Sequence, residues 1–134
     1  MVVGPWPCFD QTDATNILKA ELNGTNYTSP STVKTRLGIN APTATATMTE
    51  LSGSGYTAGG TVMTWNTASA AATSNASTAT WTNGGSTWSI VGLEIWDTSG
   101  PSRHLWGTWT GEPVSIAGSN SFAVAAAGIT VSLV

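Results

Sequence analysis

Charged side chains are scarce in this chain of 134 residues, where Lys, Arg, Asp and Glu make up 8% of the sequence. An average globular domain carries about 25%. The net charge is -3, with four Lys and Arg residues in all. Nucleic acids and anionic membrane surfaces are bound through basic faces, so we expect neither as a partner.

Cysteine and histidine each occur once, as Cys8 and His104. One residue of each type excludes a disulfide framework and a zinc finger, and it excludes most histidine-based metal sites. We therefore expect no bound metal and no cofactor.

Long hydrophobic runs are also missing. The first residues, 1–8, have no basic start and contain two prolines, which is unlike a signal peptide. No apolar run approaches the roughly 20 residues that a membrane-spanning helix needs. We expect a protein that is made in the cytoplasm of its cell and that does not insert into a membrane.

Apolar residues are nevertheless plentiful at 40% of the chain, and seven of them are tryptophans. A chain of this size buries roughly two-thirds of its unfolded surface, so it holds a core without cross-links. The composition predicts one folded domain rather than a disordered chain.

One short helix is predicted near the N-terminus, at about residues 12–23. Thr12 or Asp13 is the expected N-cap, and Gly24 is the expected C-terminal stop. Apolar side chains recur on one stripe at helical spacing: Ala14, Ile17, Leu18 and Leu22.

Short β-type runs occupy most of the remaining chain, and loops rich in Gly, Asn and Ser separate them. The runs are residues 32–39, 61–65, 77–81, 88–96, 105–109, 114–117, 121–124 and 129–133. Their spacing is typical of sandwiches and barrels. The run 88–96 is apolar almost throughout, which predicts a central strand covered on both faces. We expect a mainly β protein: an antiparallel β-sandwich or jelly roll with one short N-terminal helix.

Two segments are ambiguous. Residues 43–48 alternate Thr with Ala and Met, which suits a strand or an extended arm, and residues 67–80 form either a long hairpin or a mobile loop.

Residues 1–11 are expected to be an extended arm outside a single domain of residues 12–134. Pro5 and Pro7 deny this arm a helix and a central strand, so its apolar side chains, Trp6 and Phe9 among them, should lie across a surface. That surface belongs to a neighbouring subunit or to the domain itself.

No catalytic residues are predicted. Ser102, His104 and Asp97 are close in sequence, but the nucleophile elbow of hydrolases is absent. Glu94 and Asp97 have opposite parity on one strand, which argues against a glycosidase pair. We expect a protein that is not an enzyme.

Glu94 stands inside an apolar strand, where a carboxylate needs a partner. Lys34, Arg36 or Arg103 could pair with it within the chain, or a neighbouring subunit could; alternatively it reaches solvent at an edge. Trp6, Phe9 and Glu94 are the candidate interface residues. The tryptophans are expected in the core or at an interface, although a row of exposed Trp would also bind sugar rings.

Six short motifs follow one another between residue 17 and the end of the chain. They are Leu22-Asn23-Gly24 with Tyr27 and Pro30, Leu37–Pro42, Gly53-Ser54-Gly55-Tyr56, Val91–Asp97, Leu105-Trp106-Gly107 and Gly128–Leu133. In this order they resemble a family of small virion structural proteins of tailed bacteriophages, best known from phages of actinobacteria. Its members are described as capsid decoration, minor tail or tail fibre proteins. Ala58 and the stretch 112–119 depart from the family pattern by losing charged residues, which puts a shared salt bridge in doubt but not the fold.

The resemblance implies a non-enzymatic component of the virion. A compact domain without a stalk suits a capsid decoration protein bound to the major capsid protein. The alternative is a minor tail or tail fibre protein bound to a tail protein, with host-sugar binding through exposed Trp. Low charge and many tryptophans are typical of large interfaces, so we also expect self-association, as a trimer.

Overall fold

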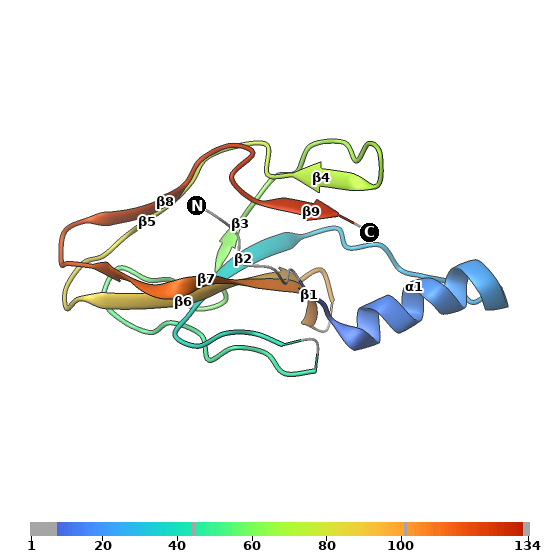
Figure 1. Cartoon of the computed structure of the whole chain (residues 1–134), viewed down its shortest axis with the longest axis horizontal. Coiled ribbons are helices and arrows are strands. Elements are labelled where there is room, and N and C mark those ends of the chain that lie inside the picture. Colours follow the sequence, from blue (N-terminus) through green and yellow to red (C-terminus); the bar gives the residue numbers. More distant parts are fainter. Residues whose placement is uncertain (1–7, 44, 101, 133–134) are drawn as a thin grey trace.

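The computed structural model describes residues 8–43, 45–100 and 102–132. Antiparallel strands form two layers, with one helix beside them, which confirms the predicted mainly β, sandwich-like fold (Figure 1). In chain order the elements are β1 (Cys8–Phe9), α1 (Gln11–Asn23), β2 (Val33–Gly38), β3 (Thr61–Val62), β4 (Ala72–Ser74), β5 (Ala79–Thr82), β6 (Trp88–Asp97), β7 (Arg103–Ile116), β8 (Ser121–Val124) and β9 (Thr130–Ser132).

The larger layer is a sheet with the strand order β1-β7-β6-β2-β3. As the apolar run predicted, β6 is central, between β7 and β2, and most of its residues are buried. Two predicted strands, 105–109 and 114–117, are parts of the single strand β7. The register shifts between the pairs Ile90–Val114 and Gly92–Trp109, and this bulge accommodates Pro113, which has no N–H for a ladder.

The second layer consists of the pairs β4–β9 and β5–β8, which lie across the main sheet (Figure 1). Residues 66–75 fold back through a tight turn between Ser69 and Ala72, so the hairpin alternative for the low-complexity stretch is the one observed. The two layers enclose the core: Leu37, Leu51, Met63, Ala79, Trp81, Trp88, Ile90, Leu93, Ile95, Leu105, Trp106, Phe122, Val124 and Ile129.

Two fully buried asparagines fix the loops of the second layer. The Asn75 amide donates to the carbonyls of Ser77 and Ala125, and its oxygen accepts from the Ile129 N–H. Asn83 has the same role in another loop, because it donates to the carbonyls of Ser86 and Ile116 and accepts from the Gly85 N–H. Each side chain thus replaces water as the partner of buried backbone groups.

The loop after β2 covers the outer face of the main sheet (Figure 1). Pro42 lies over Gly92 of β6 and Gly107 of β7, where an added Cβ would come within 3.0 Å and 2.8 Å of its ring carbons. Glycine at both positions therefore lets the loop pack closely on the strands. Residues 43–48, for which a strand or an arm was predicted, contain no strand in their described part.

The N-cap of the helix is Asp10, two residues before the first predicted cap, Thr12. The Asp10 carboxylate accepts from the N–H groups of Thr12 and Asp13, at 2.9 and 3.1 Å, so the prediction of Thr12 or Asp13 as the N-cap is wrong. Asp10, Thr12 and Asp13 are all residue types that cap helices well, so the sequence alone does not choose among them. Gly24 ends the helix in the left-handed conformation, as predicted, with φ of 66°.

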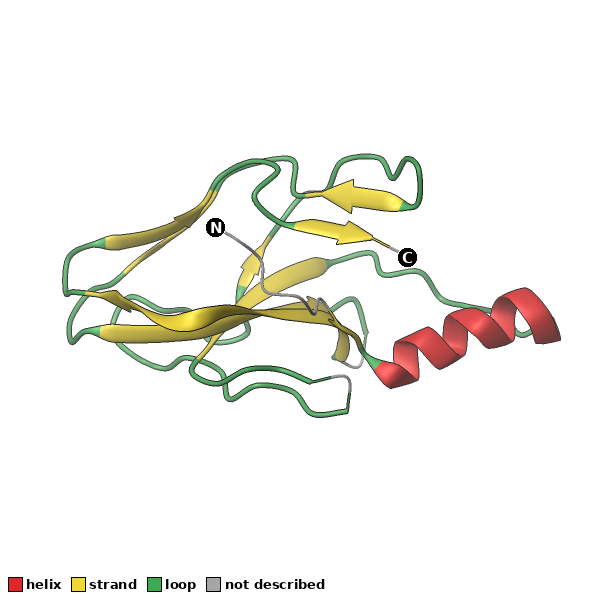
Figure 2. Ribbon diagram, viewed as in Figure 1, coloured by secondary structure: helices red, strands yellow, loops and turns green. Residues whose placement is uncertain are grey.

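The last two turns of α1 extend beyond the strands of the domain (Figure 2). Leu18 and Leu22, from the predicted apolar stripe, are 58% and 79% exposed. Asp13 is instead the buried residue of the helix. The start of α1 is therefore fixed by polar contacts, while two of the four residues of its apolar stripe are exposed.

The N-terminal arm was predicted to be unable to join its own sheet, and this is wrong for its last residues. Cys8 and Phe9 form β1, which pairs with Gly107 and Trp106 at the edge of the main sheet. A proline restricts its own position and the residue before it, whereas Cys8 and Phe9 follow Pro7 and keep N–H groups for an edge ladder. Trp6 and the rest of residues 1–7 lie outside the described residues.

Candidate functional site

Polar side chains gather where the β6–β7 hairpin meets the start of α1. Arg103, the first residue of β7, pairs in register with Asp97, the last residue of β6. Its guanidinium lies 3.3 Å from the Asp97 carboxylate and 3.5 Å from the Asp13 carboxylate of α1. It also donates to the Thr28 carbonyl at 3.0 Å. One side chain thus joins the hairpin, the helix and the segment that follows the helix.

Burial and the Arg103 charge act on the two carboxyl groups with different outcomes. For Asp13, desolvation is the largest effect and raises the pKa, although Arg103 and the Tyr27 hydroxyl oppose it. For Asp97, desolvation would also raise the pKa, but hydrogen bonds from Ser99 and the Arg103 charge outweigh it and lower the pKa. The surroundings therefore disfavour the ionised form of Asp13 and favour the ionised form of Asp97.

Tyr27 closes this cluster on the side of the helix. Its hydroxyl lies 3.3 Å from both carboxylate oxygens of Asp13, to which it donates, and the Arg103 guanidinium lies 5.2 Å from its ring centroid. Burial, followed by the nearby Asp13 charge, raises the pKa of Tyr27. The hydroxyl consequently remains a donor to Asp13 at neutral pH.

His104 is buried between two carboxylates. Its Nδ1 lies 3.3 Å from Asp10 and its Nε2 lies 3.5 Å from Glu94, while its ring packs against Trp96 with centroids 5.5 Å apart. The ring therefore lies between the N-cap of α1 and the centre of β6.

Glu94 is 1% exposed, so it does not reach solvent at an edge. Its carboxylate accepts from the Met48 N–H at 2.6 Å and from the Trp96 indole at 2.9 Å. Arg36 lies opposite Glu94 in the register, yet its guanidinium stacks over Trp96, 3.9 Å from the ring centroid. The hydrogen-bond donors to Glu94 are therefore a loop amide and an indole, with the His104 ring nearby, and not the Lys34, Arg36 or Arg103 that the sequence offered.

These contacts bear on the two enzyme readings of the sequence. Both ring nitrogens of His104 face Asp10 and Glu94, and not Ser102 or Asp97. Glu94 accepts from Met48 and Trp96, whereas Asp97 accepts from Ser99 and Arg103, so the two carboxylates share no partner. The serine-hydrolase arrangement is not assembled by these residues, and Glu94 and Asp97 are held by separate sets of partners.

The tryptophans with described side chains do not form an exposed row. Trp81, Trp88 and Trp106 are buried in the core, and Trp65 and Trp96 are half-buried. Arg36 stacks on the Trp96 ring and His104 packs against it, so this ring already has partners within the chain. Sugar binding through exposed tryptophan therefore finds no platform in the described part of the chain.

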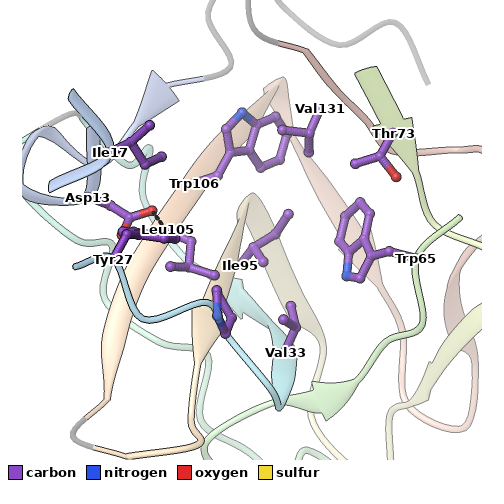
Figure 3. A pocket seen from close by; sticks show the side chains of 11 residues that line it. Asp13, Ile17, Tyr27, Val33, Trp65, Thr73, Ile95, Leu105, Trp106 and Val131 are labelled. Carbon is purple, nitrogen blue, oxygen red and sulfur yellow. Dashed lines mark hydrogen bonds between the residues drawn. The ribbon is translucent and has the colours of Figure 1, made fainter. Parts of the chain in front are cut away.

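A second feature is an apolar hollow of about 220 Å³ between the main sheet, the β4–β9 pair and the start of α1 (Figure 3). Trp65 and Val131 line one side and Ile17 the other, while Ile95 and Trp106 of the main sheet lie between them. The complete lining is Asp13, Ile17, Tyr27, Pro30, Val33, Trp65, Thr73, Ile95, Leu105, Trp106 and Val131. Such a lining suits an apolar side chain and not a charged ligand.

The predicted interface residues are placed as follows. Trp6 is outside the described residues; the backbone of Phe9 pairs with Trp106, and its side chain is not described. Glu94 is buried within the domain, and its role at an interface stays a prediction. Sequence reasoning missed Asp10 and Tyr27. The signal for Asp10 was present, because Asp before a helix is a common N-cap, but its contact with His104 spans 94 positions of the chain.

Two classes of site are not found in the described residues. They hold no group of three or more His, Cys, Asp and Glu side chains that could bind a metal ion. Within the same ranges, no helix is both long and apolar enough to span a membrane.

A comparison with curated proteins finds no significant match. The sequence model of one protein family, described as podophage GP4 fiber I protein gp80, matches residues 9–132. The match runs from β1 through β9, so it covers both the polar cluster and the apolar hollow. It supports the resemblance to structural proteins of tailed phages, and it favours the fibre alternative over capsid decoration. The chain belongs to the podophage GP4 fiber I protein gp80 family.

Proposed function

We propose that this chain is a non-enzymatic structural component of a podophage virion, located in a tail fibre. The observation that carries the proposal is the family match, which spans residues 9–132 and names a fibre protein. Capsid decoration, our first expectation from sequence, depended on the lack of a stalk. A small domain without a stalk also suits a fibre in which such domains assemble side by side.

The contacts of the polar cluster support a structural role. The carboxylates of Glu94 and Asp97 accept hydrogen bonds from the backbone, and the His104 ring lies beside Glu94. Contacts of this kind hold structural elements together. In a catalytic site, by contrast, a base is held close to a nucleophile.

We further propose that the partners are other copies of this chain, assembled as a trimer, and a tail protein. The low charge supports self-association, because few charges would need to be desolvated in an interface. Two exposed leucines on α1 support it as well, since large apolar side chains at 58% and 79% exposure favour a cover.

Electron microscopy of virions labelled with antibody fragments against this chain tests the location. We expect label on the fibres around the tail and none on the head, with a known head protein labelled in parallel as the control. Label on the head shell alone would reinstate capsid decoration, and absence from purified virions would contradict both readings.

A further inference from the structure

We propose that residues 1–7 continue β1 as an edge strand along β7 of their own chain, and that this strand leads into an apolar groove between β7 and β8. The proposal goes beyond the proposed function, because it assigns an occupant to one edge of the main sheet. It also limits how copies assemble, since an edge that is already paired cannot pair with the sheet of a second copy.

β7 extends well beyond its partner at the edge of the main sheet. It spans Arg103–Ile116, and β6 accompanies it along most of this length. On the opposite side β1 pairs with it at Gly107 and Trp106. Among the residues that the structure describes, the stretch from Thr108 onward therefore has a strand on its β6 side alone. A sheet edge of this kind offers backbone hydrogen bonds to an extended segment.

The chain preceding β1 runs toward this stretch. β1 is antiparallel to β7, with Cys8 opposite Gly107. The residues before Cys8 are therefore directed along the part of β7 that follows Gly107, and the same register places Pro7 opposite Thr108. No loop is needed to bring residues 1–7 to the edge, because β1 already lies on it.

The two prolines of this segment occupy positions where the ladder needs no N–H. The Asp10 N–H donates to the Leu105 carbonyl at 3.0 Å, which fixes the side of the strand that faces β7. N–H groups along an antiparallel strand point alternately toward the partner and away from it. Counting back from Asp10, the N–H of Trp6 points toward β7, whereas positions 5 and 7 point away. Pro5 and Pro7 therefore lose no bond to β7, and on the outer side they block a further strand, as prolines do at natural sheet edges.

An apolar groove lies farther along the same edge. It has a volume of about 650 Å³ and lies between β7 and β8, which follow one another in the chain but belong to different layers (Figure 1). Val114 lines the groove from β7, and Phe122 and Val124 line it from β8. A strand that follows the edge of β7 beyond the bulge therefore meets apolar side chains from both layers.

Residues 1–7 match this path in reach and in chemistry. When extended, they span about 23 Å at roughly 3.3 Å per residue, which is enough to reach Val114, seven positions beyond Gly107. They contain no charged side chain, so none has to be buried in the groove. Val2 and Val3 are β-branched and suit a strand, and each proline favours an extended conformation at the residue before it.

A disulfide between positions 7 and 108 tests the register. The double variant Pro7→Cys, Thr108→Cys is made in a Cys8→Ser background, so that it carries two thiols. Opposite residues without mutual hydrogen bonds have Cα atoms about 4.5 Å apart, which is within the range for a disulfide. We expect a disulfide within one chain, formed at least about ten times faster than in the control Pro7→Cys, Ser115→Cys. Ser115 is exposed on β7 but lies seven positions out of register.

Two results of this experiment would overturn the proposal. Equal rates in the two variants would mean that residue 7 has no fixed place on β7. A disulfide between copies would mean that the occupant of the edge comes from a neighbour.

Amide hydrogen exchange at Trp109, measured by NMR, tests the ladder without a change in β7. In the same register the Trp109 N–H points toward Trp6 and away from β6. We expect slow exchange in the wild type and in Trp6→Ala, which keeps the backbone N–H of residue 6. In Trp6→Pro, which loses that N–H, exchange should be at least about tenfold faster. The Thr108 N–H points toward β6, so it should exchange slowly in all three proteins and serves as the internal control.

A Trp109 amide that exchanges in the wild type as fast as in an unfolded peptide would overturn the proposal, and so would equal rates in Trp6→Ala and Trp6→Pro. Both measurements use the purified chain, whereas the location on the virion is tested by labelling. Failure of one proposal is therefore distinguishable from failure of the other.

Discussion

The two halves of α1 are attached to the molecule in different ways. The first half is held by polar bonds: Asp10 caps it, and Asp13 is buried against Arg103 and Tyr27. The second half carries two exposed leucines, Leu18 and Leu22. The comparison teaches that the position of this helix follows from its charged first turn, while two apolar side chains of its second half stay exposed.

The largest effect on the first half of α1 is expected from removing the Arg103 side chain, which pairs with Asp13. Arg103→Ala would leave Asp13 and Asp97 without their cation, and we expect a loss of about 3 kcal/mol in the free energy of unfolding, measured by urea titration. Arg103→Lys is the control, and it should lose less, because one ammonium reaches one carboxylate and lacks the guanidinium fork. Equal stability of Arg103→Ala and wild type would contradict the role of this cluster.

Removing the cap should have the next largest effect. Asp10→Ala deletes the acceptor for two helix N–H groups and the carboxylate beside His104, so we expect a loss of about 2 kcal/mol in unfolding free energy. Asp10→Asn keeps a good cap but loses the charge. It should fall between the wild type and Asp10→Ala. If both variants lose the same amount, the charge on Asp10 and not the cap fixes the helix.

The pH dependence of stability separates the two carboxyl groups at Arg103. Asp97 has a lowered pKa, so it contributes stability above its ordinary pKa of 3.8, and this is lost as the pH falls through the folded value. Asp13 has a raised pKa, so its contribution declines as the pH rises from 3.8 through its folded value. Melting temperatures measured in acid should therefore rise less steeply with pH in Asp97→Asn than in wild type, and more steeply in Asp13→Asn. The same slope in all three proteins would contradict this assignment.

The smallest effect on folding is expected in the second half of α1. Leu22→Gln removes an exposed side chain, so the unfolding free energy of the dissociated chain should change by less than about 0.5 kcal/mol. The check is urea unfolding at a concentration where the chain is monomeric. A large loss would mean that Leu22 packs on its own domain and that the two halves of α1 do not differ as described.

Much of the β architecture could be predicted because strand signals are local. The apolar run of β6 and the glycine stop of α1 lie where they were expected. The two predicted segments of β7 are joined because a bulge accommodates Pro113. A bulge is a feature of the pairing with the partner strand, so the sequence of β7 alone does not indicate it. β1 was missed because the restriction of Pro7 was extended to Cys8 and Phe9, which are free to pair.

The candidate site could be predicted only in part. Glu94, Asp97 and His104 were noticed because they are close in sequence, but their partners are not. The Met48 amide and the Asp10 carboxylate reach Glu94 and His104 from segments that are distant in the sequence. Nothing in a strand's own sequence indicates that a loop amide will bind its carboxylate. The hollow was not foreseen either, because it is formed by residues from six separate parts of the chain.

The buried loop asparagine Asn83 has a consequence for the chemical ageing of the protein. Asparagine followed by glycine deamidates when the glycine nitrogen attacks the side-chain carbonyl, and the chain has this pair at Asn23-Gly24 and at Asn83-Gly84. The Asn83 amide is fully bonded inside the fold, and the Gly84 N–H donates to the Ser54 carbonyl. Asn23 is exposed at the end of a helix, where the backbone frays. In an aged sample the first isoaspartate should therefore appear at the tip of α1, while the loop at Asn83 keeps its original chemistry for as long as the domain stays folded.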